Sequence, residues 1–322
     1  MPVRSYVAGN FMLELDGVKC GFVKSIDGGA VTAEVVTEAV GSSHFLKKHL
    51  GRITYTPFVM QFGLAMASPV RDWVNASLAG KAIEKSGAII LADHNLMAVS
   101  RREFSSALIT EVGIPALDGA SKDAAYLTLK FAPEYTRTTK ASGKVTGPAK
   151  TEQKLWLPSN FRLAVDGLDC SRVSRVGAIT IKQSVATDDI GDARDHIKVP
   201  GRIEIPNLTV TLAEAAAQSW LDWFEDFVVK GNNDESKEKN GSISLLAADL
   251  TEELMRIDFF NVGIFSIGPD KAEANADQIA TVTAHLYCER MALQFGGAKP
   301  VMSREARVRK RRATSSSRPS RR

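Results

Sequence analysis

The stretch Asn10–Cys20 (NFMLELDGVKC) occurs a second time as Asn160–Cys170 (NFRLAVDGLDC), 150 positions further along the chain. Other landmarks recur at the same spacing, namely Gly51-Arg52-Ile53 with Gly201-Arg202-Ile203, Trp73 with Trp223, and Val112-Gly113-Ile114 with Val262-Gly263-Ile264. A constant spacing over so many landmarks indicates tandem duplication of one domain. The sequence therefore predicts two copies of one fold, and we expect the function to make use of their pairing.

The duplication divides the 322 residues into a first domain at 1–136, a flexible linker at 137–158, a second domain at 159–297 and a disordered tail at 298–322. Each domain has the size of a common globular unit. No apolar run approaches the roughly 20 residues that a membrane helix needs, and no apolar leader follows Met1. We expect a soluble cytoplasmic protein that makes no membrane contact.

The net charge of +4 is distributed unevenly. The tail from Ser303 carries eight Arg and one Lys against Glu305, which gives +8, and subtracting this from +4 leaves the body at about −4. The basic residues are Arg304, Arg307, Arg309, Lys310, Arg311, Arg312, Arg318, Arg321 and Arg322. Such a tail favours contact with a polyanion, either nucleic acid or an acidic protein surface, although a plain solubility tail fits the composition equally well.

Each copy shows β-strand patterns that surround one helix pattern. Asp16-Gly17 and Asp166-Gly167 separate β-prone runs, which predicts a tight hairpin at the start of each copy. Further strands are expected at 30–36, 53–62, 88–91, 104–112 and 125–131, and in the second copy at 178–185, 203–212, 242–246, 255–262 and 278–286. This order favours a mainly β fold (α+β), with each copy a small β-barrel or sandwich flanked by a helix.

The helix of each copy carries tryptophan. Ser68-Pro69 has the residues of a helix start, and we expect the helix to end near Gly80. In the second copy, apolar residues at three- and four-residue intervals predict a helix over 212–230 with Gly231 as its C-cap. Trp73 and Trp223 are expected to pack in the core, and the alternative of ligand stacking has less support.

Several of these patterns together resemble the tail tube protein family. The relevant stretches are the Asn-Phe-x-Leu hairpins, Val199-Pro200-Gly201-Arg202-Ile203, the Trp220-Leu221-Asp222-Trp223 helix and Asn261-Val262-Gly263-Ile264. The second copy fits better than the first, which has Lys48-His49-Leu50-Gly51 at the Pro-Gly loop. The family comprises the inner tubes of contractile phages, pyocins and contractile injection systems. Together the two copies cover about four fifths of the chain.

The resemblance implies a self-assembling subunit whose strands join those of its neighbours into rings, which stack into a hollow tube. Members usually carry one such domain and form hexamers, so three two-domain chains are expected to supply six pseudo-equivalent positions. The chain would then be a tube protein or an adaptor at the tube end or hub. Expected partners are other copies of the chain and the sheath, tape-measure and baseplate or hub proteins of a phage-tail-like particle. A phage, a tailocin and a secretion apparatus all remain open.

Two polar loop arms, Ser42–Leu50 and Asp189–Pro200, are the candidate contacts between rings or subunits. Their candidate contact residues are His44, Lys47, Lys48, His49, Asp189, Arg194, Asp195, His196 and Lys198. The alternative is that these loops are ordinary exposed hairpin tips. The linker is expected to let the second copy rotate beside the first, although it also fits a passive tether.

Residues for chemistry are few, so we expect no catalytic residues, no cofactor and no metal site. The five histidines form no HExxH pair, and the aspartates near 188–195 lack the spacing of an EF-hand loop. Cys20, Cys170 and Cys288 are expected to pack as small apolar groups. The competing hypothesis to a tube protein is a two-domain nucleic-acid-binding module that uses the Arg-rich tail, and ring formation would separate the two.

Overall fold

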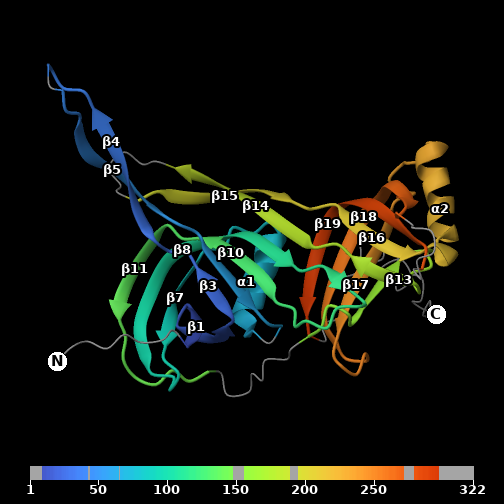
Figure 1. Ribbon diagram of the computed structural model, residues 1–322, viewed down its shortest axis with the longest axis horizontal. Helices are drawn as coiled ribbons and strands as arrows, with labels where there is room; N and C mark the ends of the chain where they lie inside the picture. Colours follow the sequence, from blue (N-terminus) through green and yellow to red (C-terminus); the bar gives the residue numbers. More distant parts are fainter. Residues whose placement is uncertain are drawn as a thin grey trace, which may run out of the picture. The chain divides into compact units, whose positions relative to one another are not determined.

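The computed structural model describes residues 9–42, 44–64, 66–147, 156–188, 195–271 and 279–296 (Figure 1). The chain forms two compact units. Unit 1 comprises 1–159 and 177–206, and unit 2 comprises 160–176 and 207–322. The division does not follow the linear order of the two copies, because a hairpin of the second copy belongs to unit 1.

Unit 1 consists of two sheets that share one long strand, β8 (Ala98–Ile114). The first sheet has the order β2-β1-β7-β8-β11, and the second has β3-β6-β10-β8-β14-β15. Their other strands are β1 (Asn10–Leu15), β2 (Val18–Val23), β3 (Ser25–Asp27), β6 (Phe58–Phe62), β7 (Lys85–Ala92), β10 (Leu127–Ala132), β11 (Tyr135–Lys140), β14 (Ile179–Asp188) and β15 (Ile197–Glu204). The hairpin β4 (Val31–Glu38) and β5 (Lys47–Tyr55), the short β9 (Leu117–Asp118) and helix α1 (Ser68–Leu78) complete the elements in this part.

The first hairpin forms as the sequence predicts. β1 pairs with β2, and the turn between them places Asp16 at φ 47° and Gly17 at φ 79°. Two successive residues with positive φ are what a type I′ hairpin turn requires, and Asp-Gly adopts them at low cost. This hairpin forms the edge of the first sheet.

The core of unit 1 is aromatic. Trp73 of α1 is 1% exposed, its ring centroid lies 5.5 Å from that of Phe131, and its indole N–H donates to the carbonyl oxygen of Ile83 at 2.9 Å. Phe58 and Phe104 pack on the same Phe131 ring at 5.0 Å. The predicted core position of Trp73 is therefore confirmed.

Unit 2 repeats the strand order of unit 1 in a single sheet. β12 (Phe161–Val165), β17 (Lys239–Leu246), β18 (Glu253–Pro269), β19 (Thr281–Phe295), β16 (Leu208–Ala213) and β13 (Val173–Val176) are neighbours in that order. In unit 1 the corresponding strands are, in the same order, β1, β7, β8, the two strands β10 and β11 together, β6 and β3. The mainly β fold with one helical segment in each copy is confirmed.

The helical segment of unit 2 is shorter and less regular than the single helix expected over 212–230. β16 extends to Ala213, and then a 3₁₀ turn (Glu214–Ala216), helix α2 (Gln218–Phe224) and a π-helical turn (Glu225–Val229) follow. Trp220 and Trp223 are 0% and 8% exposed, so the core position of Trp223 is also confirmed. The positive φ of Gly231, 73°, fits the predicted end of the helical segment.

The second copy does not repeat the first hairpin, although both turns contain Asp-Gly. β13 pairs with β16, with Val173 opposite Leu212, and β12 pairs with β17. The segment after Gly167 forms turns in which Asp169 accepts the backbone N–H of Ser171. The prediction of a hairpin here was wrong because the local turn signal does not specify which strand the following residues join.

The spacing of 150 also fails in the second half of each copy. Lys85 of β7 is opposite Ala107, and Lys239 of β17 is opposite Val262, so corresponding residues of β8 and β18 lie 155 positions apart. The opposite edges of β8 and β18 give the same spacing of 155, because Gly113 faces Thr128 of β10 and Gly268 faces Thr283 of β19. The structural counterpart of Val112-Gly113-Ile114 is Ile267-Gly268-Pro269, and the match to Val262-Gly263-Ile264 was wrong.

The predicted flexible linker, 137–158, is ordered where the structure describes it. Residues 137–140 belong to β11, and Val145 is buried beside Met12 and Ile90. Trp156 is 1% exposed and forms a β-bridge with Ala125. Residues 148–155, the middle of the predicted linker, lie outside the described part.

Candidate assembly interface

The two predicted loop arms are the ends of two matching hairpins. We name β4 with β5, residues 31–55, the first arm, and β14 with β15, residues 179–204, the second arm. Ala33 faces Ile53 and Val35 faces Leu50 in the first arm, and Gln183 faces Ile203 and Val185 faces Pro200 in the second. Each register therefore contains the same bulge at the same place. The spacing of 150 holds through both arms.

The second arm is bound to unit 1. β14 pairs with the end of β8, from Ile179 opposite Ile114 to Lys182 opposite Glu111 (Figure 1). This pairing occupies the edge of β8 beyond the end of β7. Ile179 and Ile181 are each 1% exposed, so the arm contributes apolar side chains to the core as well as backbone pairing.

Polar contacts hold the outer strand of the second arm. The backbone N–H of Lys198 donates to Oε1 of Glu134 at 2.5 Å, and its ammonium group donates to the carbonyl oxygen of Pro133. Burial lowers the pKa of Lys198, and the charge of Glu134 opposes that effect. The hydroxyl of Tyr55, at the base of the first arm, donates to Asp195 at 2.8 Å.

The first arm makes no pairing with another strand in the described part of the chain. β4 and β5 form a separate two-stranded sheet, which extends away from the rest of unit 1 (Figure 1). Its large apolar side chains are exposed, with Val31 at 54%, Val35 at 56%, Phe45 at 84% and Leu50 at 73%. Exposed apolar side chains on an open strand edge are a common feature of surfaces that bind another chain.

The structure separates the predicted contact residues into two groups. His44, Lys47, Lys48 and His49 lie on the first arm and are exposed. Asp195 and Lys198 lie on the second arm and bind within unit 1, and His196 lies beside Asp195. Asp189 and Arg194 fall outside the described residues, as do all nine basic residues of the tail, from Arg304 to Arg322.

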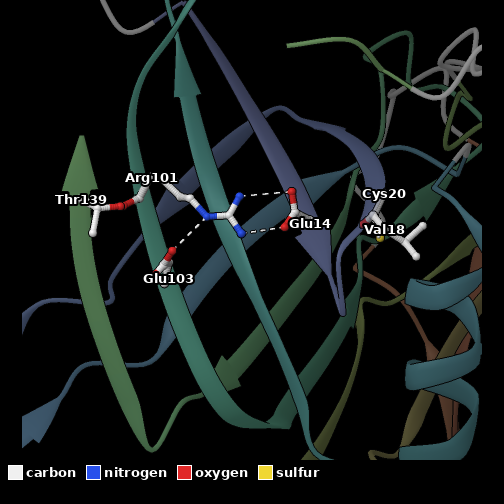
Figure 2. A network of polar contacts seen from close by, with 6 residues as sticks. All are labelled: Glu14, Val18, Cys20, Arg101, Glu103 and Thr139. Carbon is white, nitrogen blue, oxygen red and sulfur yellow. Dashed lines mark hydrogen bonds and ion pairs between the residues drawn. The ribbon is translucent and has the colours of Figure 1, made fainter. Parts of the chain in front are cut away.

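A partly buried charge network joins strands β1 and β8 of the first sheet. Figure 2 shows Arg101 of β8 between two carboxylates. Its Nη2 and Nη1 atoms donate to Glu14 of β1 at 2.6 and 3.1 Å, and Nε donates to Glu103 at 3.1 Å. The hydrogen bond from Arg101 lowers the pKa of Glu14, while burial acts in the opposite direction. Each of the three guanidinium nitrogens donates to a carboxylate, which is typical of a structural ion pair.

The cysteines differ in burial. Cys20 is fully buried and burial raises its pKa to about 11, whereas Cys170 is partly exposed. Among the described residues, no cluster of three or more His, Cys, Asp or Glu side chains is arranged to hold a metal ion. No helix in the described ranges is long and apolar enough to span a membrane.

A family model matches the chain twice. The model of the T4-like virus tail tube protein gp19 matches residues 7–137 and again residues 157–292. The chain belongs to this family. Both arms and both helical segments fall inside the matched residues, so the chain is a tail tube family member with two family domains in tandem.

Several solved structures are similar to parts of this tail tube family member. A chain of the anti-feeding prophage tube-terminating cap is 20% identical, with 48% of this chain and 96% of that chain covered and a TM-score of 0.31. A chain of the PVC sheath-tube complex of an extracellular contractile injection system is 22% identical, with 42% and 88% covered and a TM-score of 0.29. Hcp1 from Flavobacterium johnsoniae is 14% identical, with 42% and 95% covered and a TM-score of 0.26. The comparison with curated protein sequences found no significant match.

Proposed function

We propose that the chain is a structural protein that forms rings of the inner tail tube, or of the tube end or hub, in a contractile phage-tail-like particle. Three chains would supply six tube-family domains to each ring, with pseudo-sixfold symmetry. The observation that carries this proposal is the second arm, through which the second copy completes the sheet of the first copy within one chain. Repeating that junction between chains extends the same sheet around a ring.

The proposed partners follow from the family. They are further copies of this chain and the sheath, tape-measure and baseplate or hub proteins of the same particle. Assembly would begin in the cytoplasm and end in the particle. The role requires no catalytic residue and no cofactor, and the partly buried Glu14, Arg101 and Glu103 group is assigned to holding the sheet together.

The basic tail is proposed to bind a polyanion, either nucleic acid or an acidic surface of a partner. Its charge of +8, against a body of about −4, supports electrostatic contact through the tail alone.

Negative-stain electron microscopy of the purified full-length chain tests the proposal. We expect hollow rings with a sixfold outline, single or stacked. A monodisperse monomer at high protein concentration would contradict the tube role. If that monomer also bound DNA with an affinity that falls steeply with salt, the nucleic-acid-binding module would replace it.

A further inference from the structure

The two units differ at one strand edge, although their strand order is the same. In unit 1 the edge of β8 beyond β7 is covered by β14, and Val112 and Ile114 are 2% and 1% exposed. The matching residues of unit 2 are Ile267 and Pro269 of β18, which are half-buried and exposed. Within the described ranges, β17 pairs with β18 only as far as Val262, so the edge at 263–269 has no pairing strand.

The correspondence of the two edges rests on shared backbone features as well as on register. Ser106 in β8 and Asn261 in β18 both have positive φ, 46° and 56°. Each directly precedes the residue that faces the lysine of the neighbouring strand, Lys85 in β7 or Lys239 in β17. The backbone N–H of each donates to a side chain of the neighbouring strand, to Ser86 at 3.2 Å and to Asn240 at 3.3 Å. β8 therefore separates from β7 in the same way as β18 separates from β17. The residues that follow in β8 and β18 present equivalent strand edges, of which β14 covers the one in β8.

The first arm has the features that bind the second arm to such an edge. Val31 corresponds to Ile181 and is 54% exposed, whereas Ile181 is 1% exposed. A β-branched apolar residue is thus present at the same place in both arms, and only the covering strand differs.

Residues that make polar contacts in the second arm also have counterparts elsewhere in the chain. Lys48 corresponds to Lys198, and exposed Glu289 of β19 corresponds to Glu134, so the lysine and its acid both recur. Asp195 and Tyr55, which are hydrogen-bonded in unit 1, correspond to Phe45 and Ile205. The polar pair inside the chain is thus replaced by an apolar pair at the positions that would meet between chains.

From these correspondences we infer that the first arm pairs with the open edge of β18 in another copy of this chain. Ala30, Val31 and Thr32 lie beside Gly268, Ile267 and Ser266, in the register that β14 adopts on β8. The interface joins two different surfaces of identical chains, so each chain offers one arm and one edge, and the contact propagates head to tail around a ring. This inference rests on the proposed ring and specifies the residues that close it.

Cysteine cross-linking tests the register directly. Thr32→Cys and Ser266→Cys are placed on two separately tagged chains, both carrying Cys170→Ser to remove the partly exposed native cysteine, and the two chains are co-expressed. Under mild oxidation we expect a disulfide-linked pair that contains both tags. The matched control within one chain is Lys182→Cys with Glu111→Cys, which the structure places opposite each other and which should close a link without increasing the mass. The negative control replaces Thr32→Cys with Val18→Cys, an exposed position on the edge strand β2.

The outcomes separate this inference from the proposed function. Rings with the mixed-tag link support both. Rings without the link, when the Lys182 and Glu111 control closes, overturn the pairing and leave the tube role standing. Absence of both rings and link overturns the tube role and the pairing with it. A link only between Thr32→Cys and Ser266→Cys placed in the same chain would also overturn the inference, because the chain's own edge would then be the partner.

Val31→Asp provides a second test that does not depend on disulfide geometry. The charge would enter the covered edge in the assembly but remains in water in the free chain, so we expect an unchanged circular dichroism spectrum and loss of rings. Val18→Asp is the control, since Val18 is 48% exposed against 54% for Val31. Equal ring formation by Val31→Asp and the unmodified chain would contradict the proposed contact.

Discussion

Ile181 and Val31 occupy the same position in two hairpins with the same register and the same bulge, yet one side chain is 1% exposed and the other 54%. The difference lies in what covers them. The second arm finds the end of β8 within its own chain, whereas the first arm has no such strand in the described part. In the proposed ring, tandem duplication turns one of two equivalent contacts into an internal one and leaves the other for a partner.

The largest effect should come from shortening the covered side chain of the second arm. Ile181→Ala removes buried methyl groups from unit 1 and is expected to lower the free energy of unfolding by about 3 kcal/mol. Val31→Ala, the same kind of change on the first arm, should cost less than about 0.5 kcal/mol in the unassembled chain. Denaturant unfolding at concentrations too low for assembly measures both values. Similar losses for the two variants would remove the distinction between a bound and an unbound arm.

A smaller effect is expected at the ion pair that unit 1 has and unit 2 lacks. Glu14 bonds Arg101 through two hydrogen bonds, whereas Ala164 stands at the matching position of β12. Glu14→Gln should lower the free energy of unfolding by about 1–2 kcal/mol at pH 7.

The contribution of Glu14 to the stability of the folded chain should depend on pH. Because the folded-state pKa of Glu14 is lowered from its ordinary 4.5, its contribution to stability is present above pH 4.5 and is lost as the pH falls through the folded-state value. Denaturant midpoints between pH 7 and pH 3 should therefore fall less steeply for Glu14→Gln than for the unmodified chain. Parallel curves would show that Glu14 does not contribute to the acid sensitivity.

The smallest effect is a difference in reactivity between the repeated cysteines, which leaves the stability of the chain unchanged. Cys20 is fully buried with its pKa raised to about 11, so only a minute fraction is thiolate near pH 8. Cys170 is partly exposed, and its pKa is also raised by burial. We expect iodoacetamide to modify Cys170 at least about tenfold faster than Cys20 in the native chain. Mass spectrometry of the digested protein gives the rates, and equal rates would mean that the first hairpin opens easily.

The sequence was sufficient for features that local chemistry decides. Asp16-Gly17 specifies a two-residue turn, and Trp73 and Trp223 mark the buried face of each helical segment, so these predictions were confirmed. The repeat at 150 also located both arms, because no residue is gained or lost between the first strand of a copy and its arm.

Long-range pairing was beyond the reach of the sequence pattern. The second copy has four additional residues between its helical segment and β17, because Lys239 of β17 matches Lys85 of β7. The spacing of 150 therefore does not lead to the true counterpart of Val112. A similar short apolar motif at Val262 gave a false match. Nothing local indicates that β14 joins β8, because an edge strand is chosen by shape and burial over the whole sheet. The open edge at Ser266–Gly268 was therefore missed.

The central claim is that one internal contact and one contact between chains alternate around the ring, so that three chains close it. Native mass spectrometry of the smallest closed assembly tests this claim most directly. We expect a mass of three times that of the 34.9 kDa chain, with larger stacks as multiples of that unit. A smallest closed assembly of six chains, or an assembly of two, would contradict it.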